Sequence, residues 1–471
     1  MTTEKRPSAP ISAGNATPLP ADFIALMHQH WPQEADNLCR ALQETDASVS
    51  VRINRAKSPE GLPKGCEEGA KAVPWCKDAY YLPTRPSFTF DPALHGGAYY
   101  VQEASSMFLA QAIGQHVPDK PLVALDLCAA PGGKSTLLRA LLHPESLLVS
   151  NEPMRQRAQV LAENMTKWGD ARCVVTQNYP ADFSHLQHTF DLVVADVPCS
   201  GEGMFRKDDE AIRDWSLQNV DTCWRRQRSI IQDIWPALKP GGLLVYSTCT
   251  FNRLEDEDNV DWICHTLGAE RLSIAHDTAW GIHGEYHFFP GRTEGEGFFL
   301  ALLRKSEDEE LSPLSLHEGK AGKQKRQKPA KDEGPAEAKG WIKDAERFSF
   351  LQAEDNYLAI PADYQSLIAR LRQDLHVLLS GITLAERKGR DWVPCHALAM
   401  STSLQSSVFP RVELTYEQAI AYLRREAIFV EAPKGFVIVC YEGLPLGFVK
   451  NLGTRANNLY PAEWRIRKQG Q

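Results

Sequence analysis

Between residues 121 and 305 the sequence alternates between short apolar runs and longer segments with the periodicity of helices. The runs VALDLC, SLLVSNE, CVVTQN, FDLVVADVP and LLVYSTCT are bounded by turn-forming residues and predict buried strands. The segments between them predict helices, among them STLLRALL, PMRQRAQVLAENMTKWG and the stretch 212–238. Such alternation is typical of a mostly parallel sheet with helices on both faces. The sequence therefore predicts an α/β fold here, closed by the strand FFLALLRK.

The 471 residues are too many for one hydrophobic core, and changes in composition divide the chain. A helical pattern over 22–42 and the alternating strand SVSVRINRAK predict a small α/β region ahead of the main domain. A segment beginning at residue 306 has almost no bulky apolar residues and separates acidic from basic charge, as linkers do. The expected organisation is 1–20 disordered, 21–105 a lead-in region, 106–305 the α/β domain, 306–342 a charged linker, 343–405 a middle domain and 406–471 a C-terminal domain.

Composition limits the classes of partner. The formal net charge is −8, so the protein has no overall basic field and any contact with nucleic acid depends on local groups. The 11 cysteines form no CxxC pair and predict free thiols in a reducing cytoplasm, not a disulfide framework or a metal site. The N-terminal segment lacks the apolar core of a signal peptide, and no apolar stretch approaches the length of a membrane span. We expect a cytoplasmic protein with no membrane contact.

The turn CAAPGGKS follows the first strand of the α/β region and admits two interpretations. Gly133, Lys134 and Ser135 match the end of the loop GxxxxGK[ST], which predicts a P-loop nucleoside triphosphatase. However, Cys128 stands at the first glycine of that motif, where the backbone needs a freedom that cysteine lacks. The alternative is S-adenosylmethionine, whose methionine portion would face Lys134 and the amides of the turn. Glu152, at the end of the next strand, would then bond ribose hydroxyls, as such a carboxylate does in dinucleotide folds.

Cys199 and Cys249 each follow an apolar run and precede a turn, in VVADVPCSGEG and LLVYSTCTF. Open α/β sheets place their chemistry beyond the carboxyl ends of their strands, so we expect these thiols and Asp196 to converge. Carbon 5 of cytosine becomes nucleophilic when a thiolate adds to carbon 6. That route needs a reactive cysteine, an acid near ring nitrogen 3 and a base for the last step. The other interpretation is that both cysteines are small buried hydrophobes. The residues alone do not rank one thiol above the other as the nucleophile.

The boxes LDLCAAPGGKS, DVPCSGEG and YSTCT, in this order and spacing, resemble the RNA cytosine-5 methyltransferases of the Sun/nucleolar-protein type. The segments SVRIN and YYVQEASSM are similar to that family's regions before the core. GITLAERKGRDWVPCHALAMS and PLGFVKNLGTRANNLYP resemble its ribosomal RNA small-subunit methyltransferase F group. The resemblance implies a Rossmann-like class I methyltransferase core, an N-terminal RNA-binding or lead-in region and a PUA-like C-terminal RNA-binding module. It also implies methylation of carbon 5 of cytosine in RNA, and the substrate expected first is 16S ribosomal RNA of the small ribosomal subunit. We expect a monomer.

The resemblance also implies a role for each matching residue. Cys249 is the nucleophile, and Cys199 assists release of the methylated RNA. Asp196 contacts the flipped cytosine as base contact or acid, and Lys134 lies near both substrates. The residues implied to hold S-adenosylmethionine are Cys128, Ala129, Ala130, Pro131, Gly132, Gly133, Lys134, Glu152 and Asp196.

The sequence departs from the family pattern at two places. Val197 stands where the family usually has alanine, and no aspartate is in register at Asn178 and Tyr179, where one often lies beside the adenine; Asp182 comes later. The alternative functions are a P-loop triphosphatase, a non-catalytic RNA-binding assembly factor on a methyltransferase fold and, within the family, an enzyme for transfer RNA.

Local basic residues are candidates for steering RNA. They are Arg52, Arg55, Arg206, Lys207, Lys450, Arg455, Arg465, Arg467 and Lys468. Tyr460 and Trp464 lie among the C-terminal basic residues in the sequence, and their rings either stack on bases or pack at the edge of the fold. A second basic cluster is either a solvated part of the linker or a contact for RNA phosphates. Its residues are Lys320, Lys323, Lys325, Arg326, Lys328 and Lys331.

Overall fold

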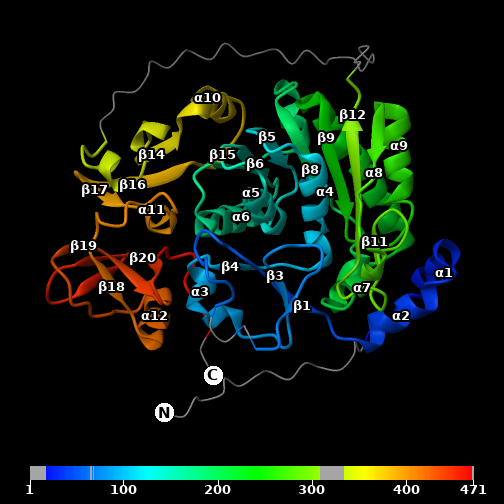
Figure 1. The fold of residues 1–471 in the computed structure, drawn as a ribbon, viewed down its shortest axis with the longest axis horizontal. Coiled ribbons are helices and arrows are strands. Elements are labelled where there is room, and N and C mark those ends of the chain that lie inside the picture. Colours follow the sequence, from blue (N-terminus) through cyan, green and yellow to red (C-terminus); the bar gives the residue numbers. More distant parts are fainter. Residues whose placement is uncertain (1–16, 64–65, 67, 308–333, 469–471) are drawn as a thin grey trace.

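The computed structural model describes residues 17–63, 66, 68–307 and 334–468 (Figure 1). The predicted disorder of residues 1–16 and the basic cluster at 320–331 therefore lie outside the described residues. Leu19, at the end of the first predicted segment, is buried in a core cluster with the first helix. None of the described helices has the length and apolar character needed to cross a membrane.

A nine-stranded sheet forms the centre of the molecule (Figure 1). Its strand order is β10-β12-β9-β8-β5-β6-β7-β15, and β11 pairs with β12. The five strands from β9 to β7 are parallel, and the outer ones are antiparallel. The strands are β5 (Val123–Asp126), β6 (Leu147–Asn151), β7 (Cys173–Thr176), β8 (Phe190–Asp196), β9 (Leu238–Thr248), β10 (Ala269–Leu272), β11 (His287–Phe288), β12 (Phe298–Lys305) and β15 (Val377–Ser380).

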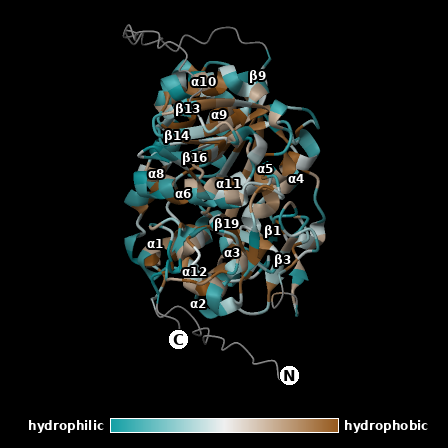
Figure 2. Ribbon diagram, turned by 90° about the vertical axis from the view of Figure 1, so that its left-hand side faces the viewer, coloured by the Kyte–Doolittle hydropathy of each residue, from teal (hydrophilic) through white to brown (hydrophobic). Residues whose placement is uncertain are grey.

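Helices cover both faces of this sheet, so the predicted α/β fold is confirmed. Successive residues of β5 point to opposite faces: Ala124 packs in the core cluster of one face, and Val123 and Leu125 pack in that of the other. The first face is covered by α4 (Leu109–His116), α5 (Gly133–Leu141) and α6 (Arg155–Trp168). The second is covered by α8 (Leu217–Ile234), α9 (Glu257–Leu267) and α10 (Gln365–Asp374). The peripheral helices carry hydrophilic residues, coloured teal in Figure 2.

The N-terminal region has two parts. An antiparallel sheet of order β2-β3-β1-β4 lies beside the central sheet (Figure 1). Two helices, α1 (Ala21–His30) and α2 (Ala35–Glu44), replace the single predicted helical segment and pack against the loops after β8 and β9, where the rings of Phe23 and Phe205 lie 5.1 Å apart. The remaining elements are β1 (Val49–Ile53), β2 (Lys71–Ala72), β3 (Ala79–Leu82), α3 (Pro92–His95) and β4 (Tyr99–Val101).

The C-terminal part contains two further sheets, of order β13-β14-β16-β17 and β18-β19-β20-β21. Thr415 and Gln418 form a capping box at the start of α12, and β19 and β20 form a hairpin. The elements are β13 (Phe348–Ala353), β14 (Asn356–Pro361), β16 (Ile382–Lys388), β17 (Asp391–Pro394), α11 (His396–Met400), β18 (Arg411–Glu413), α12 (Tyr416–Leu423), β19 (Gly435–Tyr441), β20 (Leu444–Asn451) and β21 (Ala456–Asn458).

Two local features differ from the sequence patterns. The predicted helix over 212–238 is divided into α7 (Asp209–Asp214) and α8, and Ser216 begins α8 by accepting a hydrogen bond from the Asn219 amide. In addition, β15 and α10 belong to the C-terminal part of the chain, yet β15 pairs with β7 and α10 packs on the central sheet. The edge of the central sheet at β7 is thus completed by a strand that follows β7 by about 200 positions in the sequence.

Candidate active site

The carboxyl ends of β8 and β9 bring the two cysteines into contact. Asp196 lies opposite Ser247 in the parallel register, so both strands end at the same edge. The Sγ atoms of Cys199 and Cys249 lie 3.1 Å apart, and the Cys249 amide donates to Cys199 Sγ at 3.4 Å. This contact and burial hold the pKa of the Cys199 thiol well above its usual value. Cys199 therefore stays protonated at neutral pH and can donate a hydrogen bond to the Cys249 sulfur.

An ion pair stands beside the thiols. The Lys134 ammonium lies 2.9 Å from Asp196 Oδ2 and 5.0 Å from the centre of the Phe298 ring. Ser247 Oγ donates to the other oxygen of Asp196 at 2.7 Å. Burial lowers the pKa of Lys134, but the Asp196 carboxylate outweighs burial and leaves that pKa above its usual value. The lysine is therefore charged, and it orients Asp196 at the mouth of the site.

Hydrogen bonds to β6 and α6 hold the glycine-rich turn in place. The Ala129 amide donates to the Asn151 carbonyl of β6 at 2.8 Å, and Asn164 of α6 donates to the Pro131 carbonyl at 2.8 Å. Gly132 has a φ of 119°, in the left-handed region that favours glycine, and α5 begins at the next residue. The amides of the first helical turn have no partner within the helix, so they are available to an anionic group.

Two carboxylates stand at the ends of β5 and β6. Asp126 is fully buried, and burial raises its pKa to about 7 although Ser135 Oγ donates to it at 2.6 Å. Its Oδ1 atom is buried without a hydrogen-bond partner. Glu152, which is 2% exposed, accepts from the Met154 amide at 3.0 Å. Together with Asp196, these two side chains place hydrogen-bond acceptors at the ends of three neighbouring strands, β6, β5 and β8.

At the end of β7, where the family pattern often has an aspartate, the nearby Asp182 closes a local turn. Asp182 Oδ2 accepts from the Tyr179 amide at 2.9 Å and from the Asn178 side chain at 3.3 Å, so it closes the turn before a short 3-10 helix. The Tyr179 side chain is 66% exposed. At this edge of the site the chain offers an exposed tyrosine ring where an aspartate is usual.

Sequence reasoning missed a pair of buried carboxylates behind the cysteines. Glu202 accepts from Thr250 Oγ1 at 2.5 Å, from the Phe251 amide at 2.7 Å and from Asn252 Nδ2 at 2.9 Å. Glu202 follows the first cysteine, and its three donors follow the second. This carboxylate therefore ties the loop after β8 to the loop after β9.

Glu255 makes the reciprocal connection from the β9 side. Its carboxylate accepts from the Ser200 amide at 3.0 Å, from Gln227 Nε2 at 2.7 Å and from Asn252 Nδ2 at 2.8 Å. Burial, and the nearby Glu202, raise the pKa of Glu255 to about 7. Acidic residues follow each cysteine within a few positions, in CSGEG and CTFNRLEDE. Because a charged residue in a loop that leads from a buried strand needs a partner, this pattern could have identified Glu202 and Glu255.

Several predicted RNA contacts are wrong. Arg52 is 2% exposed, and Arg206 pairs with buried Glu296 at 2.8 Å, so neither faces an RNA. Tyr460 is 1% exposed and its ring lies edge-on to the ring of His396, so Tyr460 packs inside the fold and does not stack on bases. The centres of the Trp464 and His396 rings lie 5.2 Å apart. The remaining basic residues of that prediction stay candidates.

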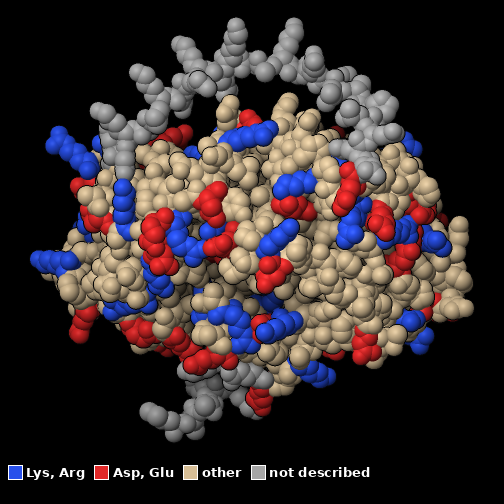
Figure 3. Space-filling view, turned by 45° about the horizontal axis from the view of Figure 1, so that its top comes forward, with Lys and Arg blue, Asp and Glu red and all other residues tan. Residues whose placement is uncertain are grey.

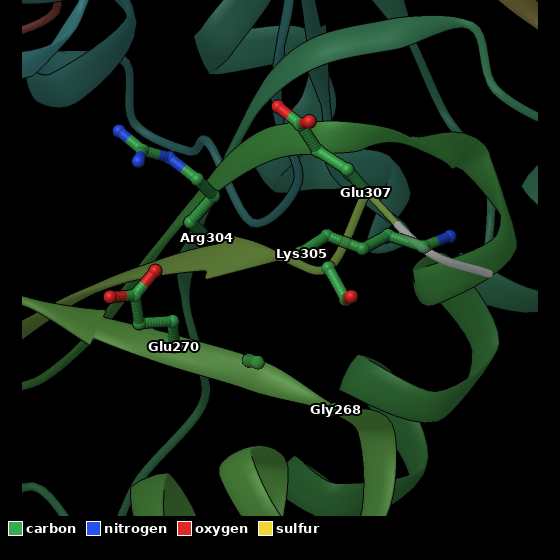
Figure 4. Close-up of a pocket in the computed structure, with 7 residues that line it drawn as sticks. Gly268, Glu270, Arg304, Lys305 and Glu307 are labelled. Carbon is green, nitrogen blue, oxygen red and sulfur yellow. The ribbon is translucent and has the colours of Figure 1, made fainter.

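A surface hollow at the other end of the sheet is not part of this site (Figure 4). It is lined by the start of β10 and the end of β12, including Glu270, Arg304 and Lys305. Because β12 runs antiparallel to β9, Arg304 lies opposite Leu243, whereas Phe299 lies opposite Thr248. The hollow is therefore at the end of the sheet remote from the cysteines.

Comparison with known proteins agrees with this geometry. The family described as 16S rRNA methyltransferase RsmB/F matches residues 117–304, the N-terminal domain of 16S rRNA methyltransferase RsmF matches 19–104, and the methyltransferase RsmF PUA domain matches 409–466. The C-terminal PUA module predicted from the sequence is thus confirmed.

Relatives of the whole chain carry one name. The chain is 32% identical over 442 residues to a ribosomal RNA small subunit methyltransferase F of Shewanella oneidensis, covering 88% of this chain and 90% of the relative. It is 30% identical over 478 residues to the protein of that name from Erwinia tasmaniensis, covering 94% and 96%.

Solved structures agree on the fold. A methyltransferase homolog from Pyrococcus horikoshii matches with a TM-score of 0.50 and 23% identity, over 61% of this chain and 100% of the other. NSun6 from the same organism, solved with SFG, matches with a TM-score of 0.52 and 19% identity, over 62% and 100%. The family match and the relatives over most of the chain favour a methyltransferase over the P-loop triphosphatase and the non-catalytic assembly factor. The chain belongs to the ribosomal RNA small subunit methyltransferase F family, and it is an S-adenosylmethionine-dependent methyltransferase.

Proposed function

We propose that the protein methylates carbon 5 of cytosine in RNA through a covalent bond between Cys249 and carbon 6 of the base. The observation that carries this proposal is the contact of two thiols, 3.1 Å apart, at the strand ends that also hold the Lys134–Asp196 pair. Methyl transfer to an oxygen or a nitrogen needs no thiol, because those atoms carry a lone pair. Carbon 5 of cytosine has none, and a thiolate that adds to the ring supplies the electrons.

The residues that we assign to S-adenosylmethionine are 128–134, Glu152 and Asp196. The unpartnered Asp126 Oδ1 and the carboxylates of Glu152 and Asp196 form an acceptor-rich wall that suits a cationic ligand with ribose hydroxyls. The first-turn amides of α5 suit a carboxylate. When bound, S-adenosylmethionine supplies the methyl group. Tyr179, exposed at the end of β7, is the candidate for the adenine ring in place of the missing aspartate.

The proposed reaction has three steps: addition of a thiolate to the ring, transfer of the methyl group and elimination of the thiolate. The Cys249 thiolate adds to carbon 6, and the electron pair of the ring double bond moves toward carbon 5. Asp196 must first take up a proton in order to donate a hydrogen bond to ring nitrogen 3. Carbon 5 then takes the methyl group, and the electron pair of the broken sulfur–methyl bond would stay on the sulfur of the methyl donor, which leaves as a neutral thioether. Loss of the carbon 5 proton to a base restores the double bond and expels the Cys249 thiolate, and Cys199 assists this release.

The state of Cys199 supports this division of roles. The raised pKa of its thiol favours a protonated sulfur, which can donate a hydrogen bond to a thiolate on Cys249. A protonated thiol is a poor nucleophile but a suitable neighbour for one. A protonated Cys199 suits this division of roles, and the order itself rests on the family resemblance, because either sulfur of the contact can be the donor.

Trapping of the covalent adduct tests the roles. Cys249→Ala should abolish both turnover and covalent attachment to RNA, because no thiolate adds to carbon 6. Cys199→Ala should instead accumulate a protein–RNA adduct that survives denaturation, because release is impaired. Denaturing gel electrophoresis with labelled RNA and S-adenosylmethionine distinguishes the two. An adduct with Cys249→Ala, and none with Cys199→Ala, would reverse the assignment.

For the substrate we propose 16S ribosomal RNA in the small ribosomal subunit, methylated by a monomer in the cytoplasm. Support comes from the names of the relatives and from the PUA module. The target base must leave its stack to reach a site at the strand ends. Lys and Arg side chains are interspersed with Asp and Glu on the face in Figure 3, so the RNA must be positioned by local groups.

Bisulfite sequencing of ribosomal and transfer RNA from a deletion strain tests the substrate. Loss of 5-methylcytosine at a position in 16S RNA, restored by the wild-type gene and not by Cys249→Ala, is the expected result. Loss confined to transfer RNA would contradict the ribosomal substrate and leave the cytosine chemistry intact.

A further inference from the structure

The N-terminal sheet contacts the cofactor loop through one buried cation. Arg52 of β1 is 2% exposed. Its Nη2 atom donates to Thr136 Oγ1 at 2.6 Å and to the Gly133 carbonyl at 3.3 Å, both in the first turn of α5. Its Nε atom donates to Gln102 Oε1 at 3.0 Å, and its guanidinium lies 4.7 Å from the centre of the Trp168 ring at the end of α6. One side chain thus contacts both helices that flank the glycine-rich turn.

Stability alone does not explain this arrangement. The groups that accept its hydrogen bonds are a hydroxyl, a carbonyl and a side-chain amide, all neutral, and its Nη1 atom is buried without a partner. Burial lowers the pKa of Arg52 to about 10, so the side chain remains charged at neutral pH. A buried cation without an anionic acceptor is costly, and such exceptions to good packing concentrate at functional sites.

The contacts continue from Arg52 to the backbone of the turn. Thr136 Oγ1, which accepts from Arg52, lies 2.9 Å from the Gly132 carbonyl, and the Thr136 amide donates to the same carbonyl at 2.9 Å. Gly132 is the residue in the left-handed conformation, with a φ of 119°. A Cβ atom at Gly133 would lie 3.5 Å from Gln102 and Tyr100, so the N-terminal sheet also packs against the turn directly.

We infer that Arg52 is a positioning residue for the cofactor: it fixes the turn at Gly132 and the first amides of α5 in the conformation that binds S-adenosylmethionine. The N-terminal sheet is therefore part of the cofactor site, although none of its residues lies in the motifs that carry the chemistry. The inference concerns binding of S-adenosylmethionine and is independent of the cytosine chemistry proposed above.

Titration calorimetry of full-length protein with S-adenosylmethionine tests this inference. Arg52→Met keeps the volume of the side chain and removes its charge and donors, and its dissociation constant should be about tenfold higher or more, the effect of one charge-assisted hydrogen bond. Arg52→Lys keeps the charge but not the fork of donors, and it should give an intermediate value. The matched control is Arg55→Met, an exposed arginine three residues away that pairs with Asp78, and it should bind as the wild type does.

A double-variant cycle separates positioning from general damage. Thr136→Val removes the hydroxyl between Arg52 and Gly132 and should also weaken binding about tenfold. Because both variants break one chain of contacts, Arg52→Met with Thr136→Val should bind no more weakly than the worse single variant. Amide exchange of 133–136 in the ligand-free protein should rise in each variant while that of α6 stays unchanged.

Two results would overturn the inference. The first is wild-type affinity in a folded Arg52→Met protein, with circular dichroism and cooperative unfolding as the check on folding. The second is additive losses in the double variant. If Arg52→Met does not fold, Thr136→Val decides alone, and wild-type affinity in that variant rejects the positioning role. Failure of the adduct experiment with normal calorimetry would reject the cytosine proposal and leave this inference standing.

Discussion

The carboxyl group of Glu255 lies behind the two thiols, where the loops after β8 and β9 meet, and its ionisation makes the stability of the fold depend on pH. Its pKa in the folded protein is about 7, against an ordinary value of 4.5. Between these two pH values the folded state holds a proton that the unfolded state releases. The stabilisation is therefore fully present below about pH 4.5 and is lost as the pH rises through about 7.

We predict that Glu255→Gln flattens this pH dependence. The amide is uncharged at both pH 5 and pH 7.5, so it removes the titration, and it lowers the free energy of unfolding by a similar amount at each pH because its nitrogen cannot accept the hydrogen bonds that the carboxyl group accepts. The wild type loses about 2 kcal/mol between pH 5 and 7.5 through this group, and the variant should not. Urea unfolding at both pH values measures the difference. Glu60→Gln, at an exposed position, is the control and should follow the wild type; the same pH profile for Glu255→Gln and the wild type would contradict the prediction.

Residue-level prediction from the sequence succeeded where a side chain sits at a strand end and failed where tertiary contacts decide. Cys199, Cys249, Asp196 and Lys134 meet because parallel strands end at one edge, which the apolar runs already indicate. Arg52 occupies a polar position in an alternating strand, and nothing local reveals that α5 covers that face.

At the scale of elements, the backbones of the loops after β8 and β9 come into close contact at Gly203. The Gly203 amide donates to the Cys249 carbonyl at 2.8 Å, and a Cβ atom at Gly203 would lie 2.6 Å from the Gly297 carbonyl oxygen and 2.9 Å from that of Cys249. These are backbone atoms, so a side chain there must move one loop away from the other.

We therefore predict that Gly203→Ala lowers the rate of methyl transfer at least about 100-fold, because a displacement near 1 Å of the reacting groups has an effect of that size. Single-turnover kinetics with saturating S-adenosylmethionine measures it. Gly114→Ala is the control: Gly114 lies in α4 with open space around its Cα, so alanine should leave the rate unchanged and stabilise the fold by about 0.5–1 kcal/mol. Equal rates in both variants would show that the loops tolerate the shift.

The helices and strands that could be predicted were those whose own sequence carries a local signal. The strands β5 to β9 follow from their apolar runs, and α12 from its capping box. The single predicted helix over 212–238 was wrong at its start, because Ser216 accepts a hydrogen bond from the chain ahead of it and begins a new helix. The four residues of β15 give no signal of their own, since only pairing with distant β7 makes them a strand.

At the scale of the whole molecule, β15 and α10 fasten the C-terminal part to the methyltransferase core. Ile368 and Leu371 of α10 are fully buried in the cluster that covers the second face of the sheet, and β15 completes its edge. These contacts join the two parts through residues that lie on either side of the connecting segment.

We predict that a protease site inserted at residue 320 separates the chain without separating the protein. After cleavage the two fragments should elute together on size-exclusion chromatography, because several buried apolar side chains and the β7–β15 pairing remain. A second variant, Ile368→Asp, places a charge in that cluster and should release the fragments after cleavage. Separate elution of the fragments of the otherwise native sequence would contradict the prediction.

The position of β15 also sets an order in time. The ribosome makes β7 about 200 residues before the strand that pairs with it, and at about 5–20 residues per second this leaves the β7 edge open for about 10–40 s. An open edge is a template for pairing with other chains. Until residue 380 has left the exit tunnel, the β7 edge of the nascent chain lacks its partner strand and is open to pairing with other chains.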